Sequence, residues 1–195
     1  DTGATYRCVT LEMMNQNIRM DEEEKIAEML KSIQIELSTE KGKQKVFLNG
    51  QDVTDKIRSK EVSANVSPVS SIKQVRLAMG GLQRKMAQGK DVIMEGRDIG
   101  TVIFPNADVK IYLDANVEVR AKRRVKQNEE KGIEMSYEEV LENIKKRDKN
   151  DMEKEMGALK VAEDAVVIDG SEMTIKEVEK AISNVIDKKL KAKKE

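Results

Sequence analysis

Three short apolar runs, each lying between segments of helical periodicity, constrain the fold of this chain most. They are Val92–Met94, Val109–Leu113 and Ala165–Ile168. Runs of this length are typical of buried parallel strands, and their alternation with helices is typical of a doubly wound sheet. The sequence therefore predicts an α/β fold built on a parallel sheet.

A second, smaller sheet is predicted closer to the amino terminus. The pair Asn49-Gly50 separates Lys45–Leu48 from Gln51–Thr54, and Asn-Gly between two apolar runs is the strongest short-range signal of a β-hairpin. The alternating segment Ile33–Thr39 extends the pattern. We expect a small antiparallel β insert here, covering roughly residues 30–60.

Five further segments carry helix signals, and four of them show apolar residues at the spacing of amphipathic helices. The five segments begin near Ile26, Ile72, Asn116, Tyr137 and Val178. Ser136 with Glu139, and Thr174 with Glu177, have the spacing of capping boxes, which mark the first turn of a helix. The sequence therefore predicts where two of these helices begin.

Composition excludes several classes of function. The 36 basic and 36 acidic residues cancel and aromatic residues are 3%, which argues against a nucleic-acid-binding module and against a membrane surface. Histidine is absent, so Ser-His-Asp catalysis, Cys-His catalysis and imidazole zinc sites are excluded. The single cysteine, Cys8, excludes an internal disulfide and fits a reducing cytoplasm. Phosphoryl transfer remains compatible, because it depends on positioning and on cations.

Charged residues follow the first predicted strand. Arg97 and Asp98 come directly after Val92–Met94, and parallel sheets bind ligands beyond the carboxyl ends of their strands. A guanidinium group binds phosphate through two parallel hydrogen bonds. The alternative is an internal salt bridge between Arg97 and Asp98 that holds the loop.

Other cations stand at helical spacing. Arg147, Asp151 and Lys154 would share one face if the helix beginning at Ser136 continued, although Arg147 and Asp151 also suit a simple i,i+4 pair. Tyr6 and Arg7 stand at the start of a predicted helix, where Arg7 could bind a phosphate. The alternative is that the segment only begins a helix that Asp1 or Thr2 caps. Three arginines, Arg120, Arg123 and Arg124, lie on one face of a predicted helix, where the alternative is a solvated cationic surface.

Two stretches resemble a known family. They are EGRDIGTVIFPNADVKIYLD at 95–114 and DTGATYR at 1–7, and both are similar to the bacterial cytidylate kinases, which are P-loop nucleoside monophosphate kinases. The resemblance covers practically the whole chain. It implies a cytoplasmic, monomeric transferase of pyrimidine nucleotide metabolism that moves the γ-phosphoryl group of ATP to CMP or dCMP. It also implies Mg²⁺ bound with ATP, no metal site of the chain itself, and no nucleic-acid or membrane partner.

The resemblance further implies roles for individual residues. The CMP phosphate would be bound by Arg7, Arg97 and Lys154, the cytosine by Ser67, Arg76 and Asp98, and the ribose by Arg147 and Asp151, with Tyr6 as another substrate residue and Arg120, Arg123 and Arg124 as catalytic candidates in a lid. Lys154 stands where the family has arginine, so the charge is kept and the planar fork is lost. The whole chain, 1–195, would form one kinase domain, with an NMP-binding insert at about 24–90 and a lid at about 120–136.

One motif of such kinases does not occur in the sequence. No G-x-x-x-x-G-K-[ST] loop, which would cradle the phosphates of ATP, is found in the 195 residues. We therefore expect a chain that is incomplete at its N-terminus, with the first and central strand of the sheet missing. The alternative function is a nucleotide-binding fragment that is catalytically inactive because the P-loop is absent.

Overall fold

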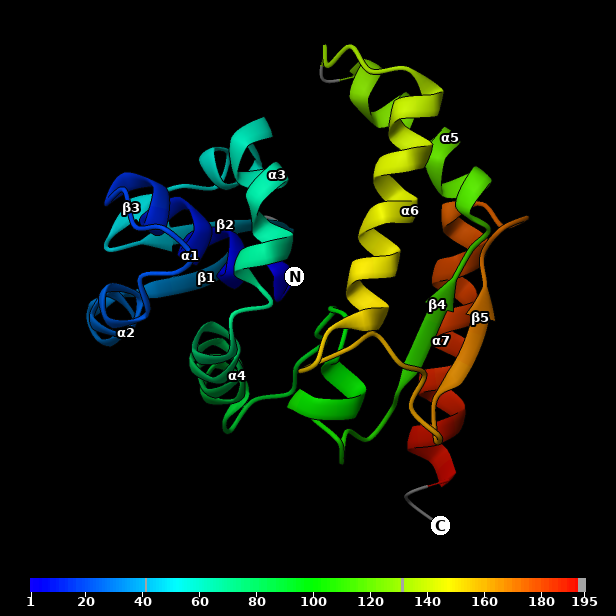
Figure 1. Ribbon diagram of the computed structural model, residues 1–195. Coiled ribbons are helices and arrows are strands. Elements are labelled where there is room, and N and C mark those ends of the chain that lie inside the picture. Colours follow the sequence, from blue (N-terminus) through cyan, green and yellow to red (C-terminus); the bar gives the residue numbers. More distant parts are fainter. Residues whose placement is uncertain (41, 131, 193–195) are drawn as a thin grey trace. The chain divides into compact units, whose positions relative to one another are not determined.

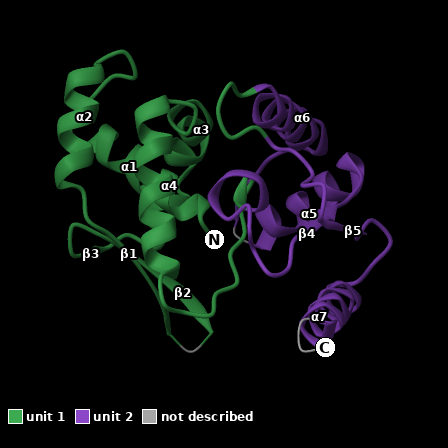
Figure 2. Cartoon of the chain, turned by 90° about the horizontal axis from the view of Figure 1, so that it is seen from below, with its two compact units in different colours: residues 1–99, 154–158 green, residues 100–153, 159–195 purple. Residues whose placement is uncertain are grey.

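The computed structural model describes residues 1–40, 42–130 and 132–192. The chain forms two compact units, shown in separate colours in Figure 2. Unit 1 consists of residues 1–99 and 154–158, and unit 2 consists of residues 100–153 and 159–195. The short segment 154–158 therefore returns the chain to unit 1 before it continues into the last strand and helix of unit 2.

Unit 1 is built around its first helix. Its elements are α1 (Gly3–Asn15), α2 (Glu23–Ser32), β1 (Ile35–Glu40), β2 (Lys43–Leu48), β3 (Gln51–Asp52), a 3₁₀ turn (Lys56–Arg58), α3 (Lys60–Val69) and α4 (Lys73–Ala87). Helix α1 contacts α2, α3 and α4, and its residues Ala4, Cys8 and Val9 are completely buried. Because it is covered on several sides, this helix shows no clear polar face in its sequence.

The predicted antiparallel insert is confirmed. Strand β1 pairs with β2, and β2 pairs with β3, with Leu48 opposite Gln51. Asn49 and Gly50 both have positive φ angles, 49° and 78°, as a two-residue type I′ turn requires. The predicted α2 stripe ends at Ser32, and the alternating residues that follow form β1.

Unit 2 contains the parallel strands. Its elements are β4 (Ile111–Asp114), α5 (Val117–Glu130), α6 (Tyr137–Glu153), β5 (Val166–Asp169) and α7 (Ile175–Ala192), and a π-helical turn (Ile99–Ile103) lies at the junction with unit 1. Strands β4 and β5 are parallel, with Ile111 opposite Val166, and α7 runs alongside β5 (Figure 1). The predicted α/β class is confirmed.

Both predicted capping boxes are present. The Ser136 backbone N–H donates to Glu139 Oε2 at 2.8 Å, and the Glu139 N–H donates to Ser136 Oγ at 3.2 Å. Thr174 and Glu177 form the same reciprocal pair before α7. These local contacts satisfy backbone donors that would otherwise have no partner at a helix start.

The predicted strand Val92–Met94 is wrong. These residues form no strand, and the side chains of Val92 and Ile93 are 45% and 92% exposed. A strand exists only as part of a hydrogen-bonded ladder, and the described residues offer this run no neighbouring strand. Strands β4 and β5 do pair, but their predicted burial is also wrong at Leu113 and Val167, which are both more than half exposed.

Helix α6 does not continue through Lys154, which was the condition for Arg147, Asp151 and Lys154 to share one face. Helix α6 ends at Glu153, and the Leu159 N–H donates to the Asp151 carbonyl oxygen at 2.7 Å. The turn that makes this possible includes Gly157, whose φ angle of 69° is left-handed. Arg147 and Asp151 share the helix, whereas Lys154 belongs to the segment in unit 1.

In the part of the chain that the structure describes, none of the helices combines the length and the apolar character needed to cross a membrane.

Candidate functional site

A buried ion pair stands at the centre of the candidate site in unit 1. Arg76 on α4 and Asp98 in the following loop are only 7% and 4% exposed, and Arg76 Nη2 pairs directly with Asp98 Oδ2. Arg76 Nη1 also donates to the Ser70 carbonyl oxygen at 3.0 Å. Buried charges are tolerated only when they are paired and hydrogen-bonded. The structure therefore brings together two of the three residues predicted to read cytosine.

Tyr6 lies next to this pair. The Arg76 guanidinium carbon is 5.3 Å from the centre of the Tyr6 ring, which is cation–π geometry. Burial raises the pKa of the Tyr6 hydroxyl and Asp98 adds to the rise, while Arg76 and Gln83 act against it. The phenol is therefore neutral at physiological pH and can donate a hydrogen bond.

Ser70 connects the pair to Lys154. Lys154 Nζ donates to Ser70 Oγ at 2.9 Å, and Ser70 Oγ donates to the Ser67 carbonyl oxygen at 2.8 Å. Ser70, which directly follows the last residue of α3, thus holds Arg76 through its carbonyl oxygen and Lys154 through its hydroxyl. No sequence pattern predicted a binding role for Ser70, and its one signal was the Ser70-Ser71 pair between two predicted helices.

The loop that carries Arg97 is tied to the start of α1. Both the Thr2 N–H and the Thr2 hydroxyl donate to the Glu95 carbonyl oxygen, at 3.0 and 2.7 Å. A Cβ at Gly96 would overlap the Thr2 hydroxyl, so only glycine permits this approach. Arg97 itself is exposed beside the buried Asp98. Thr2 precedes α1 but its side chain does not cap the helix, because its hydroxyl is used here.

Arg7 points toward a different part of unit 1. Its Nη1 atom donates to the Ile57 carbonyl oxygen at 3.0 Å and to Ser63 Oγ at 2.9 Å. Arg7 thus links α1 to the 3₁₀ turn and to α3, the helix that also carries Ser67.

Unit 2 carries the residues predicted for ribose. Arg147 Nε lies 3.8 Å from Asp151 Oδ2, and Asp151 is 3% exposed although Arg147 is not buried. This is the i,i+4 pair that the spacing indicated.

Two of the three lid arginines hold unit 2 together. Arg120 pairs with Asp148 at 2.7 Å and donates through Nε to the Ala115 carbonyl oxygen. Arg123 Nη2 donates to the carbonyl oxygens of Gly170 and Met173, at 2.7 and 3.0 Å. Arg124 is exposed. The lid role of all three stays a prediction, and Lys131 within the predicted lid lies outside the described residues.

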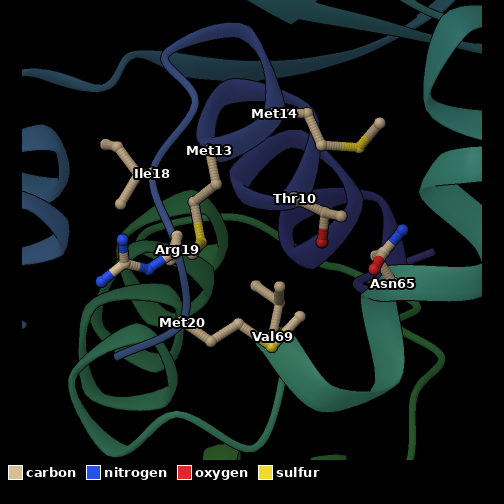
Figure 3. A pocket seen from close by; sticks show the side chains of 8 residues that line it. All are labelled: Thr10, Met13, Met14, Ile18, Arg19, Met20, Asn65 and Val69. Atoms are coloured by element: carbon tan, nitrogen blue, oxygen red, sulfur yellow. The ribbon is translucent and has the colours of Figure 1, made fainter. Parts of the chain in front are cut away.

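A separate cavity of about 200 Å³ lies in unit 1 (Figure 3). Its lining residues are Thr10, Met13, Met14, Ile18, Arg19, Met20, Asn65 and Val69. The Arg19 guanidinium points away from the other side chains and pairs with Asp21. The Thr10 hydroxyl donates to the Tyr6 carbonyl oxygen. This cavity is mainly apolar and includes none of the predicted site residues.

Residues 1–40, 42–130 and 132–192 contain no group of three or more histidine, cysteine, aspartate or glutamate side chains that could hold a metal ion.

Comparison with known proteins gives one consistent result. A protein-family model described as cytidylate kinase matches residues 1–188. A cytidylate kinase of Caldicellulosiruptor saccharolyticus is 49% identical over 91% of this chain and 79% of its own length. A cytidylate kinase of Bacillus subtilis is 46% identical over 97% of this chain and 84% of its own length.

Proposed function

The chain belongs to the cytidylate kinase family, and from this premise we propose that it binds CMP or dCMP as acceptor of the γ-phosphoryl group of ATP. The observation that carries the proposal is the buried Arg76–Asp98 pair beside Tyr6. A charged pair so deeply buried is weak evidence for stability alone. It suits a site that must present a fixed donor and a fixed acceptor to a ligand.

Cytosine has the complementary edge. Its exocyclic amine is a donor that a carboxylate accepts, and its ring nitrogen and carbonyl oxygen accept from a guanidinium. Asp98 and Arg76 are proposed for these roles, with the Ser67 hydroxyl as a third contact. Uracil reverses the donor and acceptor pattern at two of the three positions, so UMP would leave buried polar groups unpaired.

Cations are proposed for the acceptor phosphate. Arg97 is exposed beside the base-reading pair, Lys154 is anchored on Ser70, and Arg7 is held at the start of α1. Their positive charge would hold the acceptor phosphate in line with the γ-phosphoryl group of ATP. No general base is needed, because the attacking phosphate oxygen is already anionic. Arg147 and Asp151 are the candidates for the ribose hydroxyls, and Arg120, Arg123 and Arg124 for the transferring group.

Magnesium belongs to the ATP side of the proposed reaction. Within the described residues no acidic cluster fits a metal ion, and Mg²⁺ in such sites is held largely by substrate phosphates. None of the roles proposed for residues of this chain therefore requires a bond to the metal ion. The G-x-x-x-x-G-K-[ST] motif for ATP phosphates does not occur in these 195 residues, so binding of the acceptor is the direct test.

The test is a titration of the 195-residue chain with CMP, dCMP, UMP and AMP by isothermal calorimetry. We expect CMP and dCMP to bind at least about tenfold more tightly than UMP, because a polar group left unpaired costs on the order of 1–3 kcal/mol. Equal or tighter binding of UMP would refute the base-reading roles of Arg76 and Asp98.

Arg97→Ala tests the phosphate contact. We expect this change to weaken CMP binding by about tenfold or more, since a charge-assisted hydrogen bond contributes roughly 1.5–3 kcal/mol. Folding should change little because Arg97 is exposed. Arg19→Ala is the matched control, since Arg19 is also exposed and pairs with Asp21 outside the candidate site. An unchanged CMP-induced thermal shift in Arg97→Ala would remove Arg97 from the site.

A further inference from the structure

Gly157 approaches the guanidinium of Arg76 more closely than any residue with a side chain could. A Cβ atom built on Gly157 would overlap Arg76 Nη2, Cζ and Nε at distances that real Cβ atoms do not show. The three atoms are almost equally far from that position. The Gly157 backbone therefore packs against the guanidinium group as a whole, and not against a single nitrogen atom.

Within the described residues, four groups pack around the guanidinium. Asp98 and the Ser70 carbonyl oxygen accept its hydrogen bonds, the Tyr6 ring lies 5.3 Å from its central carbon, and the Gly157 backbone covers it. Each group removes one direction in which the side chain could turn. Arginine has several rotatable bonds, so such enclosure is what gives it a single orientation.

The segment that carries Gly157 is itself anchored at this point. Lys154 from the same segment donates to Ser70 Oγ, and Ser70 is the residue whose carbonyl oxygen accepts from Arg76. The left-handed φ angle of 69° at Gly157 turns the backbone there, and glycine adopts this conformation without strain. Residues 154–158 thus form a short strap over Arg76 within unit 1.

We infer that Gly157 is a specificity-determining positioning residue: its missing side chain lets the strap close over Arg76 and hold the guanidinium in the orientation that reads cytosine beside Asp98. The inference rests on the proposed function, in which Arg76 and Asp98 read the base. Gly157 acts through Arg76 and has no contact with the reacting phosphates in this scheme.

The overlap determines what a side chain at position 157 would change. The atoms that collide belong to the far end of Arg76, whose side chain can shift while α4 stays in place. An alanine should therefore displace the guanidinium from Asp98, or lift the strap, at a cost in stability because the buried pair is weakened. Base selectivity should fall as well, whereas a residue with a purely structural role would lower stability and leave the selectivity of the folded protein unchanged.

The experiment compares Gly157→Ala with Gly89→Ala in the 195-residue chain. Gly89 has a φ angle of 70° and open space around its Cβ position, so its alanine variant introduces the same backbone strain without the overlap. The dissociation constants of CMP and UMP are measured by calorimetry. We expect the CMP-to-UMP selectivity to fall about tenfold in Gly157→Ala, by the loss of one hydrogen bond to a charged group, and to be unchanged in Gly89→Ala.

Two further measurements separate positioning from general damage. In an Arg76→Lys background, Gly157→Ala should cause no additional loss of selectivity, because the group that it displaces is gone. The NMR signal of Arg76 Nε–H should shift or broaden in Gly157→Ala alone. If Gly157→Ala folds poorly, Ser70→Ala replaces it, since it removes the hydroxyl that anchors Lys154 and the strap without adding a Cβ at position 157, and the CMP-to-UMP selectivity should again fall.

The outcomes distinguish the two proposals. If the unmodified chain does not prefer CMP to UMP, the proposed function fails. If the unmodified chain prefers CMP and Gly157→Ala keeps the selectivity of Gly89→Ala, the positioning role of Gly157 is overturned while the proposed function stands. An equal effect of Gly157→Ala with and without Arg76 would also overturn it, because the glycine would then not act through that arginine.

Discussion

The Arg76–Asp98 pair is the contact whose loss should affect this molecule most at the scale of single residues. Both side chains are more than nine-tenths buried, and they form a direct ion pair. Removing one partner leaves a buried charge without its counter-ion, which is far more damaging than losing a surface pair. The free energy of unfolding lost when one partner of an ion pair is removed should therefore increase with the burial of the pair.

Asp98→Asn should destabilise unit 1 by about 3–5 kcal/mol, the usual effect of breaking a buried ion pair from one side. The asparagine has nearly the same shape, so the loss reports charge and not packing. Urea denaturation followed by circular dichroism measures the change.

Asp21→Asn is the matched control for that prediction. Asp21 pairs with Arg19 at 3.0 Å, but both side chains are more than 70% exposed, so the expected change is far smaller than that of Asp98→Asn. Similar losses in Asp98→Asn and Asp21→Asn would show that burial does not distinguish the two pairs.

Residues of the candidate site differed in how well sequence could identify them. Arg97 and Asp98 were identified because a compact motif carries them, and Arg76 because of the family resemblance. Ser70 and Gly157 were missed, since each contacts the candidate site only through a partner far along the chain. Lys154, for example, is 84 positions from the Ser70 hydroxyl that it contacts, and no local pattern encodes such a pair.

At the scale of elements, the hairpin of unit 1 is stabilised by the hydrogen bonds of one carboxylate, that of Asp52. Asp52 in β3 accepts hydrogen bonds from the Thr54 hydroxyl at 2.6 Å, from the Thr54 N–H at 3.0 Å and from Lys45 Nζ at 3.1 Å. The Thr54 bonds, helped by Lys45, lower the pKa of Asp52 from 3.8 to about 2. The carboxylate thus fixes the end of the strand against its neighbour.

This pKa shift predicts a pH dependence with a definite sign. A pKa lowered by folding adds stability above the unfolded value, near 4, and that stability is lost as pH falls through about 2. Asp52→Asn should therefore lower the urea midpoint at pH 7, and the difference from the unmodified chain should shrink as the pH approaches 2. Asp55→Asn, on the neighbouring turn, serves as the comparison. A difference that grows toward low pH would contradict the assignment.

Elements that depend on contacts within a few residues were predicted correctly, and those that depend on distant contacts were not. The two capping boxes and the Asn-Gly turn depend on contacts within a few residues, and all three were confirmed. The strand predicted at Val92–Met94 depends on a partner strand elsewhere, which periodicity cannot supply. The same holds for the end of α6, where a contact between Leu159 and Asp151 turns the chain away from the helix.

At the scale of the whole molecule, the two units differ in how much apolar surface they bury. The core of unit 1 gathers side chains from α1 to α4 and from all three of its strands or their flanks. Within the described part of unit 2, the buried apolar side chains are Ile103, Ala121, Val140 and Ile168, while Leu113 and Val167 are exposed on the parallel strands. Because burial of apolar surface is the main favourable contribution to folding, unit 1 should be the more stable one.

Cys8 allows this difference to be measured. It is completely buried in α1, and burial raises the pKa of its thiol to about 12, so it should react with a thiol reagent at pH 8 only when unit 1 opens. In a urea series we expect part of the helical circular dichroism to be lost before Cys8 becomes reactive, because α5, α6 and α7 belong to unit 2.

A matched pair of core substitutions assigns the two steps. Val140→Ala in unit 2 and Val75→Ala in unit 1 each remove two methyl groups from a buried valine, at a cost of about 1–3 kcal/mol. Val140→Ala should lower the midpoint of the first circular dichroism step and leave the labelling midpoint of Cys8 unchanged. Val75→Ala should lower the labelling midpoint. If both variants moved both midpoints equally, the chain would unfold as one cooperative structure, and the unequal cores would not behave as separate units.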